Sequence, residues 1–120
     1  IWGLAFKPET DDIREAPALY MIDKLLKAGA QVKAFDPEAM ENVEQKYGDK
    51  ISFGEDMYTV TEEADALLIC TEWSIFRTPD YKRLKSNLKQ PVIFDGRNLY
   101  PTVELAKEGI HYISIGRQKV

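Results

Sequence analysis

The sequence predicts an α/β fold: a Rossmann-like, doubly wound parallel sheet of about six strands with helices on both faces, in three α/β/α layers. Two observations carry this prediction. Short apolar segments typical of strands alternate with amphipathic helical segments along the whole chain. The apolar segment 66–70 is uninterrupted, as in a central parallel strand that is covered on both faces. We expect the Rossmann strand order 3-2-1-4-5-6.

The expected elements follow one another at short spacing. Strands are predicted over residues 1–4, 31–35, 51–53, 66–70, 91–94 and 111–115. Helices are predicted from 17 to about 28 and over about 38–47, 57–63, 81–88 and 102–107. Pro17 suits a first helical turn, and Gly29 suits the end of that helix. Asp36 is a plausible N-cap for the second helix, with Pro37 in its first turn.

Composition limits the class of protein. With 120 residues, 44% of them hydrophobic, the chain can form one domain over residues 1–120 with its own core. The net charge of −4 argues against nucleic acid or an anionic membrane as the main partner. The single cysteine, Cys70, excludes an internal disulfide and fits a reducing cytoplasm. Because the chain opens on strand-like residues without an initiator Met, we expect a fragment of a longer protein.

Three loops are expected to converge on one edge of the sheet. In open parallel sheets, ligands bind beyond the carboxyl ends of the strands, where the strand order reverses. The loop after the first strand carries Phe6, Lys7 and Arg14, the loop after the fourth carries residues 71–73, and the loop after the fifth carries residues 95–98. Cations at such an edge suit an anionic ligand.

Each cation also has an ordinary structural explanation. Lys7 could be a solvated loop lysine. Arg14 could pair with one of the acids in residues 11–15, and Arg97 could belong to a simple turn after a buried strand. The residues alone leave these alternatives open.

Other candidate groups favour structural roles. The adjacent Asp11 and Asp12 lack further spaced ligands, so a loop and capping role is favoured over a metal site. Cys70 ends an apolar strand and indicates a buried thiol, not a nucleophile. His111, at the start of the last predicted strand, favours a structural role over a catalytic one. Trp73 favours packing in the core or at an interface.

The first loop lacks the glycine fingerprint of dinucleotide-binding Rossmann folds. It runs Gly-Leu-Ala-Phe-Lys-Pro from Gly3, not Gly-x-Gly-x-x-Gly. Asp36 ends the second strand, where a ribose-binding acid would lie, but without the glycine turn we interpret it as a helix cap. This domain is therefore not expected to bind NAD by itself.

Four motifs span essentially the whole chain in order. They are Gly-Leu-Ala-Phe-Lys-Pro-x-Thr-Asp-Asp-x-Arg-Glu-x-Pro over 3–17, Thr71-Glu-Trp73 with Phe76, Asp95-Gly-Arg97-Asn98 and Ser114-Ile-Gly-Arg117. Together they resemble the C-terminal, UDP-binding domain of the UDP-glucose/GDP-mannose dehydrogenase family. The second and third motifs favour the UDP-glucose 6-dehydrogenases within that family.

The resemblance implies an enzyme that oxidises UDP-glucose to UDP-glucuronate with two equivalents of NAD⁺. It implies that Phe6, Lys7 and Arg97 contact the UDP-sugar, and that Arg14 faces NAD held mainly by an N-terminal domain of the same chain. Cys70 does not match the motif of the family's nucleophile, so no catalytic residue and no metal site are expected here. The full-length protein is expected to be a homodimer or a higher oligomer in the cytoplasm.

Two alternatives remain beside this reading. The same domain could serve a dehydrogenase of UDP-N-acetylmannosamine, another UDP-N-acetylhexosamine or GDP-mannose, because the first motif is expected to contact phosphates and not sugar hydroxyls. The chain could also be a stand-alone module that binds a nucleotide or a protein partner without catalysis.

Overall fold

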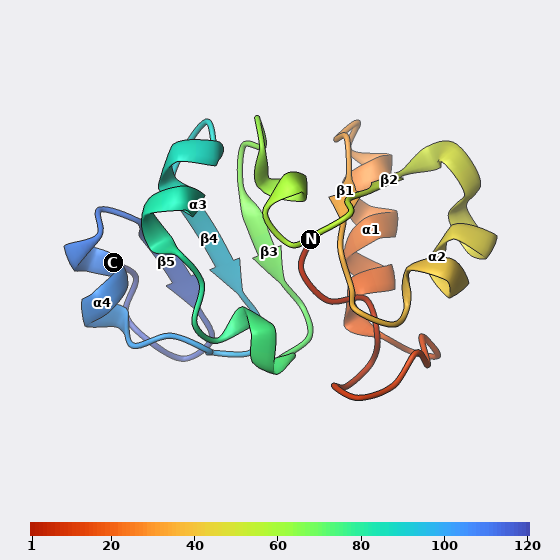
Figure 1. Cartoon of the computed structure of the whole chain (residues 1–120), viewed down its shortest axis with the longest axis horizontal. Helices are drawn as coiled ribbons and strands as arrows, with labels where there is room; N and C mark the ends of the chain where they lie inside the picture. The colour runs from red at the N-terminus through yellow and green to blue at the C-terminus, as the bar shows by residue number, and fades with distance from the viewer.

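The computed structural model describes residues 1–120 and is an α/β fold built from short parallel strands and helices (Figure 1). The strands are β1 (Lys33–Ala34), β2 (Ser52–Phe53), β3 (Leu67–Ile69), β4 (Val92–Asp95) and β5 (His111–Ser114). The α-helices are α1 (Pro17–Lys27), α2 (Met40–Tyr47), α3 (Tyr81–Asn87) and α4 (Thr102–Lys107). Three single 3₁₀ turns complete the chain: η1 (Gly48–Lys50), η2 (Thr59–Thr61) and η3 (Ser74–Phe76).

The strands form two parallel sheets that the N-terminal segment joins. One sheet pairs β1 with β2, and the other has the order β3-β4-β5. Trp2 forms parallel bridges to Phe35 on one side and to Ile69 on the other. Its backbone N–H donates to Leu68 O at 2.8 Å, and its carbonyl accepts from Cys70 N at 2.9 Å. Trp2 therefore occupies the place that the predicted first strand has in a Rossmann order.

The prediction of six strands is not confirmed, since the structure has five strands in two sheets. The predicted strand 1–4 is reduced to the bridge at Trp2, because Gly3 turns the backbone out of the extended region with φ of 94°. The predicted helix 57–63 is also wrong, since only the 3₁₀ turn η2 forms there. Glu63 follows with φ of 58°, a left-handed conformation that ends a helix.

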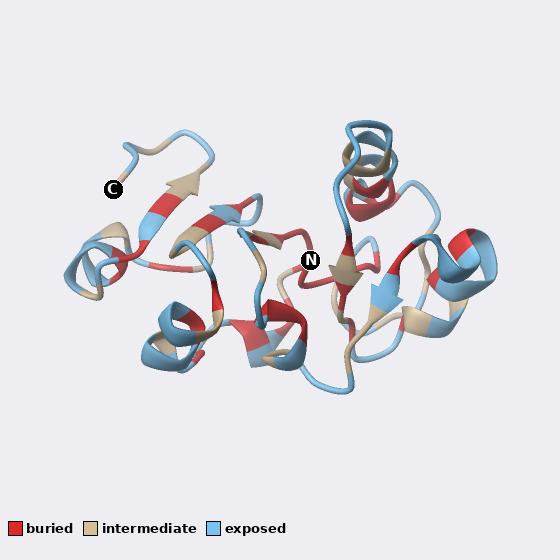
Figure 2. Ribbon diagram, turned by 90° about the horizontal axis from the view of Figure 1, so that it is seen from above, coloured by how far each residue is buried: buried red, intermediate tan, exposed pale blue.

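Helices cover both faces of this arrangement, as Figure 2 shows from above. Neighbouring residues of the extended segments alternate between two hydrophobic clusters: Ile1 and Cys70 pack with α1 and α2, whereas Trp2 and Ile69 pack with α3 and α4. Alternation along strands sends successive side chains to opposite faces, so each cluster fills one side of the sheet.

One part of the sheet has no helix over it. Phe94 and Ile113 lie in register across β4 and β5 on the face opposite α3 and α4, beside Leu68 of β3, which still packs against the cluster of α1 and α2. Phe94 is 42% exposed, although parallel sheets are usually buried on both faces.

No helix of the structure is both long and apolar enough to cross a bilayer.

Candidate functional site

Three loop ends meet around the buried carboxylate of Asp36 at the carboxyl edge of the strands. Its Oδ2 accepts hydrogen bonds from Leu4 N at 2.7 Å, Ala5 N at 3.1 Å and the indole Nε1 of Trp73 at 3.0 Å. Its Oδ1 accepts from the backbone N–H groups of residues 38 and 39, both at 2.8 Å. Asp36 thus caps the turn that precedes α2 and not the helix itself, which begins at Met40.

The stem of the first loop packs directly on Thr71. Gly3 approaches so closely that a Cβ there would lie 2.5 Å from both Cβ and the backbone N of Thr71. The Thr71 hydroxyl donates to Ala5 O at 2.6 Å. Asp36 and Thr71 therefore hold the Leu4–Ala5 peptide groups from two sides, and only glycine fits at position 3.

Beyond this stem the loop carries Phe6 and Lys7 out into solvent. Phe6 is 40% exposed, and its backbone N–H donates to Asp12 O at 3.0 Å, which closes the loop. The Lys7 ammonium lies 5.3 Å from the Phe6 ring centroid and forms no hydrogen bond or ion pair. Its charge is therefore available to an anion.

Arg14 pairs with Asp12, the structural alternative that the sequence left open. The Arg14 Nη2 lies 2.6 Å from Asp12 Oδ2, while 88% of the Arg14 side chain stays exposed. Hydrogen bonds from the Arg14 side chain and backbone lower the pKa of Asp12 to about 2. A hollow of about 590 Å³ brings Arg14 together with Phe6, and Glu15 and Pro17 also line it.

Arg97 is held by its backbone and by its side chain. Its N–H donates to Asp95 Oδ1 at 2.7 Å, and Asp95 Oδ2 accepts from Leu99 N at 2.7 Å and from the Tyr112 hydroxyl at 2.6 Å. Arg97 Nη2 lies 2.5 Å from Oε2 of Glu72. This ion pair joins the loop after β4 to the loop after β3.

Glu72 has one oxygen without a partner. Its Oε1 is buried and accepts no hydrogen bond, while Oε2 is taken by Arg97. Burial acts to raise the pKa of Glu72, but the hydrogen bond from Arg97 and the charges of Arg97 and Arg77 outweigh it, so the pKa lies below its ordinary value. Glu72 is thus an ionised acceptor beside the candidate cation.

The closing motif is structural. Arg117 donates through Nη1 to Tyr100 O at 2.9 Å, through Nη2 to the Tyr112 hydroxyl at 2.8 Å and through Nε to Ser114 Oγ at 3.0 Å. These bonds fasten the end of the 95–100 segment to β5.

The predicted residues share one edge but do not all touch. Lys7, Arg14 and Arg97 share no common hydrogen-bond or ion-pair partner; the link between the first and third loops runs through the Thr71–Ala5 bond and the adjacent Glu72–Arg97 pair. Sequence reasoning did not assign roles to Thr71, Glu72 or Asp95, and it missed the bonds from Asp36 to the first loop.

A signal for the two buried carboxylates exists in the sequence. Phe35-Asp36 and Phe94-Asp95 each end an apolar strand with the same dipeptide, followed at once by a turn. In both cases the carboxylate accepts backbone N–H groups two residues ahead. An aspartate at this position satisfies donors that the turn would otherwise leave buried and unpaired.

Cys70 is a buried thiol, as the sequence predicted. The Cys70 thiol is buried, and this burial raises its pKa to about 11, which disfavours the reactive thiolate. His111 Nδ1 lies 2.6 Å from Val120 O on the outer side of β5. No group of three or more His, Cys, Asp or Glu side chains is arranged to hold a metal ion.

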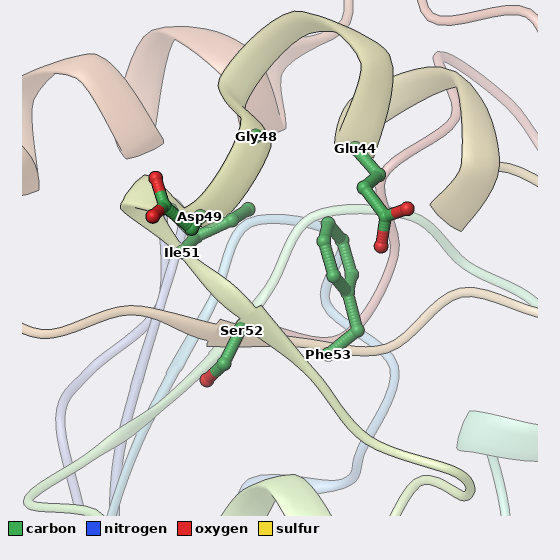
Figure 3. Close-up of a pocket in the computed structure, with 6 residues that line it drawn as sticks. All are labelled: Glu44, Gly48, Asp49, Ile51, Ser52 and Phe53. Atoms are coloured by element: carbon green, nitrogen blue, oxygen red, sulfur yellow. The ribbon is translucent and has the colours of Figure 1, made fainter.

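A second hollow lies between α2 and β2, away from these loops (Figure 3). It has a volume of about 490 Å³ and is lined by Glu44, Gly48, Asp49, Ile51, Ser52 and Phe53. Its ionisable lining groups are both carboxylates, so it does not suit an anion.

The chain is similar to known proteins over nearly its whole length. Residues 1–102 match the family described as "UDP-glucose/GDP-mannose dehydrogenase family, UDP binding domain". A UDP-glucose 6-dehydrogenase of Rhizobium meliloti is 48% identical over 117 residues, which are 98% of this chain and 26% of that protein. The chain therefore spans about a quarter of the length of the curated relatives it matches.

Solved structures of nucleotide-sugar dehydrogenases have the same fold. A UDP-glucose dehydrogenase from Pyrobaculum islandicum superimposes with a TM-score of 0.76 at 34% identity, covering 93% of this chain and 23% of that one. A UDP-D-ManNAc dehydrogenase from Pyrococcus horikoshii gives a TM-score of 0.74 at 27% identity, covering 97% of this chain and 24% of that one.

Proposed function

The chain belongs to the UDP-glucose/GDP-mannose dehydrogenase family, and on this premise we propose that it is the UDP-sugar-binding domain of an NAD-dependent UDP-glucose 6-dehydrogenase. One observation carries the proposal: at the carboxyl edge of the strands, a chain 48% identical to such an enzyme presents an exposed aromatic ring and an unpaired ammonium. Residues 1–120 form this domain, and Phe6, Lys7 and Arg97 bind the nucleotide-sugar.

The charges of these residues suit a diphosphate. A UDP-sugar carries two negative charges, and the chain as a whole is acidic, so the attraction must come from a few placed cations. Lys7 offers an ammonium without a competing partner. Arg97 keeps 37% of its side chain exposed and has donors beyond the one that Glu72 occupies. Phe6 provides an apolar surface next to Lys7.

NAD does not fit the usual dinucleotide site of this fold in this chain. That site needs a free acid after the second strand to hold a ribose. Here both oxygens of Asp36 are buried and already accept five hydrogen bonds. We therefore assign the binding of NAD mainly to another part of the polypeptide. Arg14, 88% exposed on the outer side of the first loop, is proposed to face that cofactor.

The domain works as one wall of an active site. Closing the cation-bearing loops over the substrate excludes water and orients the C6 carbon toward chemistry that the rest of the polypeptide supplies. We propose that the whole enzyme is a homodimer or a higher oligomer and acts in the cytoplasm, where a free buried thiol such as Cys70 is stable.

Two substitutions in the full-length enzyme test the proposal. Lys7→Ala and Arg97→Ala should each lower kcat/KM for UDP-glucose by about 10- to 100-fold, because each removes a charge-assisted hydrogen bond to the substrate. Steady-state kinetics with UDP-glucose as the varied substrate measure this.

A matched control removes a lysine that is not assigned to substrate binding. Lys82 is exposed on α3 and forms no hydrogen bond or ion pair, so Lys82→Ala should leave kcat/KM unchanged. Unchanged kcat/KM in both the Lys7 and the Arg97 variant would contradict the assignment.

A second candidate keeps the reaction and changes the sugar. The likeness to a UDP-D-ManNAc dehydrogenase, at a TM-score of 0.74, favours a UDP-N-acetylhexosamine as the alternative substrate. Assaying the full-length enzyme against UDP-glucose, UDP-N-acetylmannosamine and GDP-mannose separates these candidates.

A gene that encodes no NAD-binding segment beside this chain would instead favour a non-catalytic nucleotide-binding module.

A further inference from the structure

Asp36 is the most heavily hydrogen-bonded side chain of the molecule, and it forms no hydrogen bond to any residue assigned to the substrate. It is fully buried, and its carboxylate accepts five hydrogen bonds from three separate segments. Two of the donors, Leu4 N and Ala5 N, immediately precede Phe6 and Lys7. A third donor is the indole of Trp73, which immediately follows Glu72.

We propose that Asp36 is a positioning residue for UDP-sugar binding, a role that rests on the function proposed above. Its Oδ2 fixes the stem of the loop that presents Phe6 and Lys7. Through Trp73 the same oxygen fixes the loop that carries Glu72, and Glu72 holds Arg97 at 2.5 Å. The buried carboxylate of Asp36 thereby sets the position of Phe6 and Lys7 on the first loop relative to Arg97 on the loop after β4.

The arrangement requires a carboxylate. An ionised carboxylate only accepts hydrogen bonds and has about four lone-pair sites on two oxygens. All five of its partners here are N–H donors, two on Oδ1 and three on Oδ2. In Asp36→Asn an NH₂ group must face either the two or the three donors, so one set loses its acceptor in a buried place.

The chain contains a second aspartate, Asp56, that caps a turn as Asp36 does but makes no bond between loops. Asp56 Oδ1 accepts from the backbone N–H groups of Tyr58 and Thr59, both at 2.8 Å. This is the same two-and-three-residue spacing that Asp36 Oδ1 has with residues 38 and 39. Asp56 makes no bond to the first loop, to Trp73 or to Arg97. Because Asp56 uses only Oδ1, asparagine can keep both of these bonds, so Asp56→Asn makes the same chemical change at a turn without disturbing the first loop, Trp73 or Arg97.

The test compares these two substitutions in the full-length enzyme. Asp36→Asn is expected to raise KM for UDP-glucose about tenfold, equivalent to about 1.4 kcal/mol, with a much smaller change in kcat, because the displaced groups bind the substrate throughout the reaction. KM for NAD⁺ should stay within about twofold of the parent value, since the cofactor is bound mainly elsewhere and Arg14, proposed to face it, is held by Asp12 and not by Asp36. Asp56→Asn should leave KM for UDP-glucose unchanged.

A role limited to stability would give a different pattern. It would lower the fraction of active enzyme, and hence apparent kcat, and would leave KM for UDP-glucose at the parent value in Asp36→Asn. That result overturns the inference while leaving the proposed function intact, provided that the parent enzyme turns over UDP-glucose. A parent enzyme without this activity contradicts the proposed function and the inference together.

Two milder substitutions serve if Asp36→Asn does not fold. Trp73→Phe removes one donor to Oδ2, and Thr71→Val removes the hydroxyl that holds Ala5 O. Each releases one tether of the same loops and should raise KM for UDP-glucose about two- to fivefold, the range of about 0.5–1 kcal/mol for a single hydrogen bond. Unchanged KM in both variants overturns the inference.

Discussion

At the scale of single residues, Gly3 decides the geometry of the candidate site. Its φ of 94° lies in the left-handed region, and it turns the chain from the Trp2 bridge into the first loop. The position that a Cβ would take is already filled by the backbone N and the Cβ of Thr71. Any side chain at position 3 would push the first loop away from the loop after β3.

Gly3→Ala is therefore expected to destabilise the chain by about 2 kcal/mol or more, from backbone strain together with a clash against main-chain atoms. Urea denaturation of the chain, followed by circular dichroism, measures the free energy of unfolding. Gly29 is a matched control, because it has a similar φ of 88° with no atom within 4 Å of the added Cβ. Gly29→Ala should cost only the strain, about 1 kcal/mol. Equal losses for both variants would contradict the close contact with Thr71.

At the scale of elements, β4 shows how one strand serves two different environments. Ile93 is fully buried in the cluster beneath α3 and α4, whereas its neighbour Phe94 is 42% exposed on the opposite face. Phe94 lies between Leu68 and Ile113 in the register of the sheet. The uninterrupted apolar sequence of this strand is typical of two covered faces, but within this chain only one of them has helices over it.

Matched substitutions on β4 test this difference. Ile93→Thr should lower the free energy of unfolding by about 2–4 kcal/mol, since it removes buried apolar volume and buries a hydroxyl. Phe94→Thr should cost only about 1 kcal/mol, because the ring is partly solvated and threonine is a good strand former. Urea denaturation of the 120-residue chain checks both values. A loss for Phe94→Thr as large as that for Ile93→Thr would mean that the face is covered.

At the scale of the whole molecule, the chain holds one wall of the proposed active site. It carries two hydrophobic clusters and a bridged sheet, so it is expected to fold by itself. It has no free acid for the ribose of NAD and no exposed thiol. Relatives are about four times its length.

The isolated chain should therefore produce no NADH from UDP-glucose and NAD⁺. It should bind UDP with a Kd on the order of 1 mM, because two charge-assisted hydrogen bonds supply only about 3–6 kcal/mol. NADH absorbance and isothermal titration with UDP check the two statements. Measurable dehydrogenase activity in this chain would overturn the division of the site between this domain and the rest of the enzyme.

Local sequence patterns were enough to predict the α/β class, the family, and the helices α1, α2, α3 and α4 within a few residues. These follow from local periodicity, from glycine and proline at helix ends, and from motifs that lie within short stretches of chain. The expected parallel topology also located on one edge the two loops that carry Phe6, Lys7 and Arg97, since parallel strands place their carboxyl ends together.

How those loops are held became visible only in the folded chain. The contact of Gly3 with Thr71, the bonds from Asp36 to Leu4, Ala5 and Trp73, and the pairing of Arg97 with Glu72 join residues more than twenty positions apart. The predicted first strand is likewise only a bridge at Trp2, because the chain turns at Gly3, where it packs against Thr71. Local patterns report which face a residue prefers, whereas hydrogen bonds between distant segments exist only once the chain has folded.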